Sequence, residues 1–249
     1  MDIGKSISYI FEDDEWANKV GIGALIAMVP ILNFAGIGYE VQVIRSVARG
    51  EARPLPKWDD FGQFFMDGLW LALARLIYAL PIFVLMGVPF VSWLIFVFAA
   101  ATTQDEDRLA AFLPLVFLLC GCAFLIILLY SLTIGVISPA ITAQYIRRGT
   151  FGACFDVPAI LRFIRDNGSN YLTVWLMSLA VGLASSAVIG SVGAFLNLIP
   201  CLGQLAYLLL LGGVVTMMYA VTGHLVGQLL REDVARTAGT AALLPPATA

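Results

Sequence analysis

The sequence predicts an all-α integral membrane protein, a polytopic bundle of transmembrane helices. Only 12% of its 249 residues are charged and 60% are hydrophobic, whereas an average soluble domain is about 25% charged. The charges are clustered, and the stretches between the clusters are apolar and continuous, which favours helices over the alternating strands of a membrane barrel. With 14 basic and 17 acidic residues, the chain lacks the basic excess of a nucleic-acid-binding protein. We therefore expect the lipid bilayer, and no nucleic acid, as a partner.

Five segments are long enough to cross a bilayer, since a transmembrane helix needs about 20 apolar residues. These predicted spans are 20–39, 69–101, 112–146, 171–198 and 203–230. The last two share one stretch without formal charge, and the sequence Asn197-Leu-Ile-Pro-Cys-Leu-Gly203 marks the turn between them. We predict a single transmembrane domain over 1–236, followed by a flexible tail over 237–249.

The first segment, 20–39, has two interpretations, because Pro30 and Asn33 lie at its middle. As one kinked helix it spans the bilayer once, since transmembrane helices tolerate proline. As two half-helices it enters and leaves on the same side, because ten helical residues reach only about 15 Å. We expect the kinked span, which gives five spans, and keep the re-entrant hairpin, which gives six passes, as the alternative.

Orientation follows from the lysines and arginines of the short loops, which concentrate on the cytoplasmic side. Loops 40–67 and 147–166 each carry four, whereas 105–108 carries one and the 199–202 turn carries none. We expect loops 40–67 and 147–166 and the C-terminus in the cytoplasm. Five spans place the N-terminus outside, and a re-entrant first segment places it inside. The charges of residues 1–19, two lysines and five acids, favour neither.

Two connectors, Trp58–Leu69 and Phe155–Asp166, have the pattern of amphipathic helices. At about 100° per residue, their apolar side chains share one arc and their charged side chains the opposite arc. This predicts two helices in the membrane interface, with Asp59 or Asp60 and Asp156 as their N-caps. We expect them to anchor the spans that they join, with docking of a partner as the alternative.

A weak internal repeat relates 20–101 to 112–198. Gln42-Val-Ile-Arg45 recurs as Gln144-Tyr-Ile-Arg147, and each set closes an apolar helix before a connector. Two spans separate the units, so the units would point the same way, as the parallel repeats of some transporters do. Chance similarity between basic connectors is the alternative, and both interpretations stay open.

Small residues recur at every fourth position of the fourth segment, at Gly182, Ser186, Gly190 and Ala194. A stripe of this kind lets two helix backbones approach closely in lipid. We expect it to pack within the chain, with an oligomer contact as the alternative.

Motifs for metal, cofactor or catalytic chemistry are missing from the sequence. The four cysteines are not spaced as the ligands of a zinc or iron–sulfur site. The single histidine, His224, has no acidic residue near it in sequence, and there is no P-loop or nucleophile elbow. We therefore expect no metal, no cofactor and no enzymatic activity.

Three ionisable residues, Glu40, Arg75 and His224, lie at the end of a predicted span or inside one, where such groups are functional candidates. At 1.5 Å per residue, Arg75 and His224 lie about 9–10 Å inside the cytoplasmic ends of their segments, and Glu40 closes its own. We predict a Glu40–Arg75 ion pair with His224 close by, as a ligand-binding cluster. The alternative is that Arg75 reaches the headgroups and His224 bonds a helix carbonyl.

Several short motifs are distinctive: Tyr9-Ile-Phe11-Glu-Asp-Asp-Glu-Trp16, Gly38-Tyr39, Leu55-Pro56-Lys-Trp58-Asp59-Asp60-Phe61, Asp67-Gly68-Leu69 and Tyr78-Ala-Leu-Pro81. Together they resemble a prokaryotic membrane-protein family that is catalogued only as a domain of unknown function, over most of the chain to about Arg231. The resemblance implies a helical integral membrane protein of a bacterium or archaeon, in its plasma membrane. It implies no activity and no site residues.

Two function classes follow from these observations. The few polar residues within the spans favour a non-enzymatic scaffold or accessory subunit that packs beside other membrane proteins, because a solute path needs more polar groups. The repeat and the broken helices favour a permease or a protein that handles lipids or small molecules. We expect the first class and keep the second as the alternative.

Overall fold

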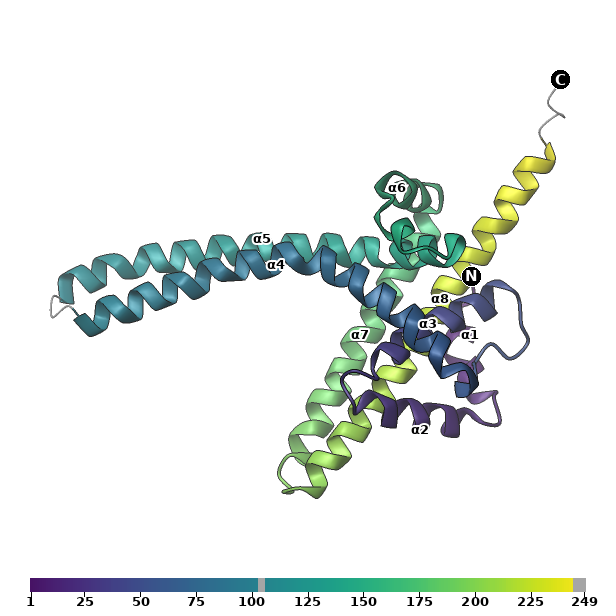
Figure 1. Ribbon diagram of the computed structural model, residues 1–249, viewed down its shortest axis with the longest axis horizontal. Coiled ribbons are helices and arrows are strands. Elements are labelled where there is room, and N and C mark those ends of the chain that lie inside the picture. The colour runs from purple at the N-terminus through teal and green to yellow at the C-terminus, as the bar shows by residue number, and fades with distance from the viewer. Residues whose placement is uncertain (103–105, 244–249) are drawn as a thin grey trace. The chain divides into compact units, whose positions relative to one another are not determined.

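The computed structural model describes residues 1–102 and 106–243, and within these residues it contains helices and turns but no strand (Figure 1). The predicted all-α class is therefore confirmed. The elements, in order, are α1 (Lys5–Phe11), α2 (Trp16–Ala27), α3 (Phe34–Ala48), η1 (Trp58–Asp60), α4 (Phe61–Thr102), α5 (Glu106–Arg148), η2 (Phe151–Phe155), α6 (Val157–Asp166), α7 (Gly168–Leu196) and α8 (Leu202–Leu243).

The chain divides into two compact units. The first unit comprises Met1–Leu73 and Pro139–Ala249, and the second comprises Ala74–Ser138. In the second unit, parts of α4 and α5 carry long apolar side chains that are mostly exposed. The Tyr130 hydroxyl donates a hydrogen bond of 2.8 Å to the Tyr78 carbonyl, which joins the two helices within that unit.

Four helices among the described residues are long and apolar enough to cross a membrane. They are Trp58–Thr102, Phe112–Arg148, Gly168–Leu196 and Leu202–Ala238. They correspond to the second to fifth predicted spans, and the turn predicted at Asn197–Gly203 lies between α7 and α8. In the charged turn predicted at 105–108, Asp105 lies outside the described residues.

The prediction of five spans is not confirmed, because segment 20–39 is not a continuous helix. α2 ends at Ala27 and α3 begins at Phe34, with turns over Pro30 and Asn33 between them. α2 has 12 residues, which extend about 18 Å at 1.5 Å per residue, well short of the ~30 Å hydrocarbon core. The proline and asparagine therefore break the segment where a kink was expected.

The amino-terminal region instead runs along α8 in one direction and returns in the other. The Ser6 hydroxyl bonds the His224 ring, and the Tyr9 hydroxyl bonds the Ala220 carbonyl, so α1 is antiparallel to α8. α2 crosses α8 nearer its start, where a Cβ on Gly23 would lie 2.6 Å from the Thr216 side chain.

α3 then runs back beside α8 in the same direction as α8. A Cβ on Gly223 would lie 3.1 Å from the Glu40 carbonyl, and a Cβ on Gly227 would lie 2.6 Å from the Val47 side chain. Residues 1–48 therefore form a hairpin whose two ends lie at the same end of α8. This geometry corresponds to the re-entrant alternative.

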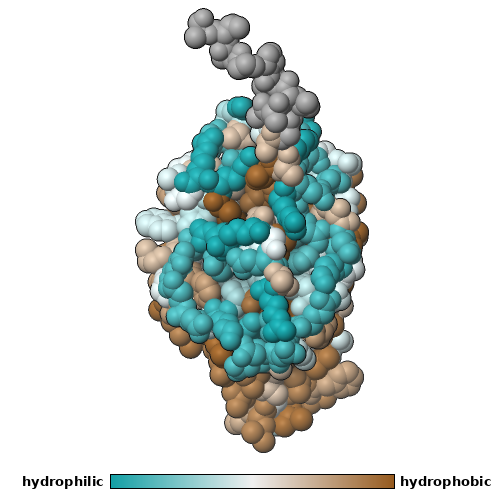
Figure 2. Space-filling model, turned by 90° about the vertical axis from the view of Figure 1, so that its right-hand side faces the viewer, coloured by the Kyte–Doolittle hydropathy of each residue, from teal (hydrophilic) through white to brown (hydrophobic). Residues whose placement is uncertain are grey.

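The carboxyl-terminal end of α8 is the meeting point of the first unit's charged segments. Arg147 pairs with Asp233, Asn170 bonds Glu232, and the Asp2 amide bonds the Gln228 side chain. Figure 2 shows hydrophilic surface over much of this face and hydrophobic surface below it. The α7–α8 turn lies at the other end of the pair and exposes apolar side chains such as Leu198 and Leu202. The predicted tail from 237 begins as helix, since α8 continues to Leu243; residues 244–249 lie outside the described residues.

The connector Trp58–Leu69 is not a separate interfacial helix. After the short η1 turn it forms the first turns of α4, which continues to Thr102. Its apolar arc packs on protein: the rings of Tyr39 and Trp58 stack with centroids 4.7 Å apart, and Phe64 meets both edge-on. The Asp60 carboxylate accepts from the Gln63 amide, as an N-cap does.

The second connector does contain a separate helix, α6. Its predicted N-cap is confirmed, because the Asp156 carboxylate accepts a 3.0 Å hydrogen bond from the Ala159 amide. Ile160 and Phe163 are buried in the protein, whereas Val157 and Leu161 are exposed. The apolar face of α6 is therefore divided between the protein core and the surroundings, and its place in the interface stays a prediction.

The small-residue stripe of α7 does not pack on α8. A Cβ added to Gly182 or Gly190 would meet nothing within 4 Å, and Ser186 and Ala194 are exposed. The contact with α8 uses the neighbouring side of the helix, where a Cβ on Gly193 would lie 2.5 Å from the Tyr207 ring. The stripe therefore does not carry the α7–α8 contact, and its packing within the chain stays a prediction.

Candidate functional site

Two of the three predicted cluster residues, Glu40 and His224, lie in the α3–α8 region of the first unit. Both are buried. The Thr222 hydroxyl donates a 3.1 Å hydrogen bond to the Glu40 carboxylate, and His224 lies only two residues further along α8. Arg75 belongs to the second unit, so the predicted Glu40–Arg75 ion pair stays a prediction.

The surroundings of His224 are polar and come from α1 and α8. Nδ1 of the ring lies 2.9 Å from the Ser6 hydroxyl and 3.0 Å from the Gln228 amide nitrogen. Because the Gln228 amide nitrogen can only donate, Nδ1 accepts this hydrogen bond and carries no proton. The Tyr9 ring stacks on His224 with centroids 4.4 Å apart. His224 thus bonds side chains, and no helix carbonyl is needed to hold Nδ1.

A cavity of about 790 Å³ opens beside this group. α1, the loop that follows α3, and the last third of α8 form its walls. His224 and Gln228 line it, as do Lys5, Arg53 and Arg231. Glu40 is not among its lining residues, so His224 alone of the predicted cluster faces this space.

Four consecutive acids, Glu12 to Glu15, are each paired with a cation. The pairs are Glu12–Lys5, Asp13–Lys19, Asp14–Arg53 and Glu15–Lys57. The Asp13–Lys19 pair is buried at 2.6 Å, and the Lys19 ammonium also donates to the Leu55 carbonyl. The acidic run was visible in the sequence, but its partners at 53 and 57 come from the α3–α4 loop and required the fold.

The groups around Asp13 shift the pKa of its carboxyl. Burial by itself would raise the pKa of this carboxyl. Hydrogen bonds from the Lys19 ammonium and the Glu15 amide, together with the positive charges of Lys19 and Arg53, outweigh burial and lower the pKa below its ordinary value. Asp13 is therefore a carboxylate at neutral pH, and it joins α2 to the 50–58 loop.

Gly38 of α3 and Gly68 of α4 lie where these two helices cross in close contact. A Cβ on Gly38 would lie 1.8 Å from the Phe64 carbonyl, and a Cβ on Gly68 would lie 1.7 Å from the Phe34 carbonyl. Only glycine permits this crossing of α3 and α4. Next to Gly68, the Asp67 carboxylate accepts from the Arg45 guanidinium at 2.5 Å and from the Tyr145 hydroxyl at 2.8 Å.

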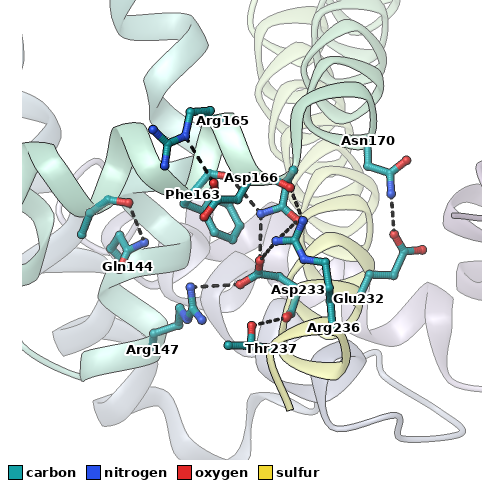
Figure 3. A network of polar contacts seen from close by, with 12 residues as sticks. Gln144, Arg147, Phe163, Arg165, Asp166, Asn170, Glu232, Asp233, Arg236 and Thr237 are labelled. Atoms are coloured by element: carbon teal, nitrogen blue, oxygen red, sulfur yellow. Dashed lines mark hydrogen bonds and ion pairs between the residues drawn. The ribbon is translucent and has the colours of Figure 1, made fainter. Parts of the chain in front are cut away.

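A further polar network surrounds Asp233 on α8 (Figure 3). Its buried carboxylate lies 3.0 Å from Arg147 and 2.6 Å from Arg236, and it accepts a 2.9 Å hydrogen bond from the Asn167 amide. Arg236 also donates to the Asp166 carbonyl. The network therefore joins α5, the α6–α7 junction and α8 at one point.

Chemically, these clusters are suited to holding helices and binding small polar groups. Among residues 1–102 and 106–243, no group of three or more histidine, cysteine, aspartate or glutamate side chains is placed to hold a metal ion. Sequence reasoning found His224 but missed Asp13 and Asp233, since a single aspartate beside an apolar run gives no local sign of its partners.

Comparison with known families identifies one match. A family model described as "Protein of unknown function (DUF4013)" matches residues 22–198, which is more than half of the chain. Searches of curated proteins and of solved structures find no match. The matched range includes the α3–α4 crossing and α6, whereas α1 and α8 lie outside it.

Proposed function

The chain belongs to the DUF4013 family, and from its own geometry we propose that it is a non-enzymatic scaffold or accessory subunit that packs beside other proteins in the membrane. The family is described only as a protein of unknown function. The four candidate spans of this chain are consistent with a membrane protein. The finer assignment rests on which surfaces of those spans the chain leaves uncovered.

The observation that carries the proposal is that three of the four candidate spans leave their most apolar stretch almost entirely uncovered. None of this stretch is buried in the α4 span and only 6% in the α5 and α7 spans, whereas 22% is buried in the α8 span. Lipid offers no hydrophobic drive for helix association, so close packing on a partner helix relies on small residues, and Gly182 and Gly190 of α7 are open for such a contact.

The polar groups support the same proposal, because most of them bond one another at one end of α8. Asp13, Asp67 and Asp233 each accept from a cation and from at least one further donor. They stabilise the meeting point of the helices. A transporter needs polar groups along its path, whereas these three carboxylates join helices and loops to one another.

The proposed orientation places this end of α8 in the cytoplasm of a prokaryotic cell, at the plasma membrane. Loops 40–67 and 147–166 each carry four basic residues, and basic loops stay on the cytoplasmic side. Because residues 1–48 form a hairpin, the same argument places residues 1–11 in the cytoplasm as well.

Purification from native membranes tests the proposal. We expect the tagged chain, extracted in a mild detergent, to be recovered with a stoichiometric membrane-protein partner. Leucine at Gly182 and Gly190, on the uncovered stripe, should reduce the recovered partner at least tenfold. The matched control is leucine at Ala184 and Val188, exposed positions on the opposite side of the same helix. Recovery of the chain alone, with transport by the pure chain in liposomes, would overturn the proposal.

A second candidate function, binding or transport of a small polar molecule, is favoured by the 790 Å³ cavity at His224. Lys5, Arg53 and Arg231, which line the cavity, would contact such a ligand, and Nδ1 of His224 holds Ser6 and Gln228 in place beside it. His224→Phe keeps a ring for the stack with Tyr9 and removes the acceptor. If this function holds, uptake of solute by liposomes containing the pure chain should be lost in His224→Phe and retained in the exposed-site control Lys57→Gln.

A further inference from the structure

A hollow lies where α5, α6 and α8 meet, and arginine side chains dominate its wall. It measures about 500 Å³. α5 contributes Arg147 and Arg148, α6 contributes Arg162, and α8 contributes Arg236. The Asp233 network of Figure 3 forms one side of it. The hollow is therefore lined mainly by basic side chains, and the Asp233 network holds one of its walls in place.

The charges around this hollow do not balance. Arg147 and Arg236 share the single carboxylate of Asp233. The remaining pairs are Arg148–Asp156 and Arg165–Asp166. Arg162 has no hydrogen-bond or ion-pair partner among the residues that the structure describes. Four arginines line the hollow, against the two carboxylates of Asp166 and Asp233, which leaves an excess of two positive charges.

The position of the hollow relates it to the ends of the spans. α7 begins at Gly168, directly after α6 and Asn167, and α5 ends at Arg148. Val157 and Leu161 of α6 are 50% and 55% exposed. A second hollow, of about 280 Å³, is bounded by Leu161, Arg162 and Arg165, so apolar and basic side chains adjoin on the same helix.

We propose that the arginine hollow binds the phosphate of an anionic phospholipid headgroup. Guanidinium groups bind phosphate oxygens in pairs, which gives both strength and geometry. Basic pockets between transmembrane helices on the cytoplasmic side have the chemistry for such headgroups. The exposed Val157 and Leu161 give acyl chains an apolar contact beside the phosphate. A free phosphate ion would gain nothing from these side chains, so the surface favours the lipid.

Lipid titration read by native mass spectrometry tests this site. The delipidated full chain is titrated with dioleoylphosphatidylglycerol and, separately, with dioleoylphosphatidylcholine. We expect the first phosphatidylglycerol to bind at least tenfold more tightly than phosphatidylcholine. A variant with Arg148→Gln and Arg162→Gln should lose roughly 25-fold in phosphatidylglycerol affinity, since one basic residue near an anionic lipid surface is worth about fivefold.

The control variant removes the same charge elsewhere. Arg49→Gln with Lys57→Gln takes away two exposed cations outside the hollow, and it should keep the preference for phosphatidylglycerol. Unchanged phosphatidylcholine binding and an unchanged Tm in both variants would show that folding is intact. Equal loss in both variants would overturn the site, because net charge alone would then explain the binding. If inorganic phosphate alone binds the chain as tightly as phosphatidylglycerol at the same concentration, the assignment to a lipid is overturned.

Discussion

The Lys19 ammonium lies 2.6 Å from the Asp13 carboxylate, and both side chains are buried. This pair joins the start of α2 to the turn before it, and the ammonium also bonds the Leu55 carbonyl. The Lys19 carbonyl in turn accepts from the Trp58 indole. One pair thus connects the amino-terminal hairpin to the loop that leads into α4.

Replacing Lys19 by methionine should destabilise the fold strongly. The change leaves Asp13 as a buried carboxylate without its cation, which costs about 3–5 kcal/mol. The matched control is Lys57→Met, because the Lys57–Glu15 pair is more than half exposed on both sides and such pairs contribute about 0–1 kcal/mol. Thermal unfolding in detergent measures both. Equal losses of Tm would contradict the importance of the buried pair.

The same pair predicts a loss of stability in acid. The pKa of Asp13 is lower in the folded protein than its ordinary value of 3.8. Its contribution is therefore complete above pH 3.8 and is lost as the pH falls through the folded pKa. Hydrogen exchange over residues 1–27, corrected for intrinsic rates, should accelerate in this acid range. Asp13→Asn should be less protected at neutral pH and lack this step; an identical pH profile would count against the mechanism.

Gly38→Ala should disrupt the crossing of α3 and α4. The new Cβ would lie 1.8 Å from the Phe64 carbonyl, so backbone must move, and overpacking of this kind costs about 1–3 kcal/mol or more. Gly62→Ala is the control, because its Cβ would meet nothing within 4 Å and alanine favours helix by roughly 0.5–1 kcal/mol. Denaturation of the two variants should give shifts of opposite sign.

Asp233→Asn should loosen the junction of α5, α6 and α8. Arg147 and Arg236 would lose their shared carboxylate, at a cost of about 2 kcal/mol, since the arginines retain some solvent. Asp166→Asn removes an exposed carboxylate from the same region and should change stability by less than about 0.5 kcal/mol. Cleavage of the α5–α6 connection by a protease would report the loosening; unchanged cleavage in Asp233→Asn would refute it.

The long elements of this fold are predictable from sequence, and the contacts between them are not. Runs without charge located four spans, because a bilayer imposes that pattern directly, but the second span begins 11 residues earlier than expected, at Trp58, and the last ends 8 residues later, at Ala238. Pro30 and Asn33 were visible, but whether they kink or break a helix depends on whether α8 covers both halves. The partners of Asp13, Asp67 and Asp233 lie on other elements, so no local pattern could identify them. The stripe at Gly182 predicted close packing, yet its neighbouring face contacts α8.

The position of residues 1–11 relative to loop 49–57 distinguishes an amino-terminal hairpin from a first segment that spans the membrane. In a cysteine-free background, single cysteines are placed at Ser8 and at Ala52, and Cys201 is retained alone in a third variant. We expect a membrane-impermeant maleimide to label Ser8→Cys and Ala52→Cys only after cells are permeabilised, and to label Cys201 in intact cells. Labelling of Ser8→Cys in intact cells, with Ala52→Cys protected, would show a first segment that spans the membrane and would contradict the hairpin.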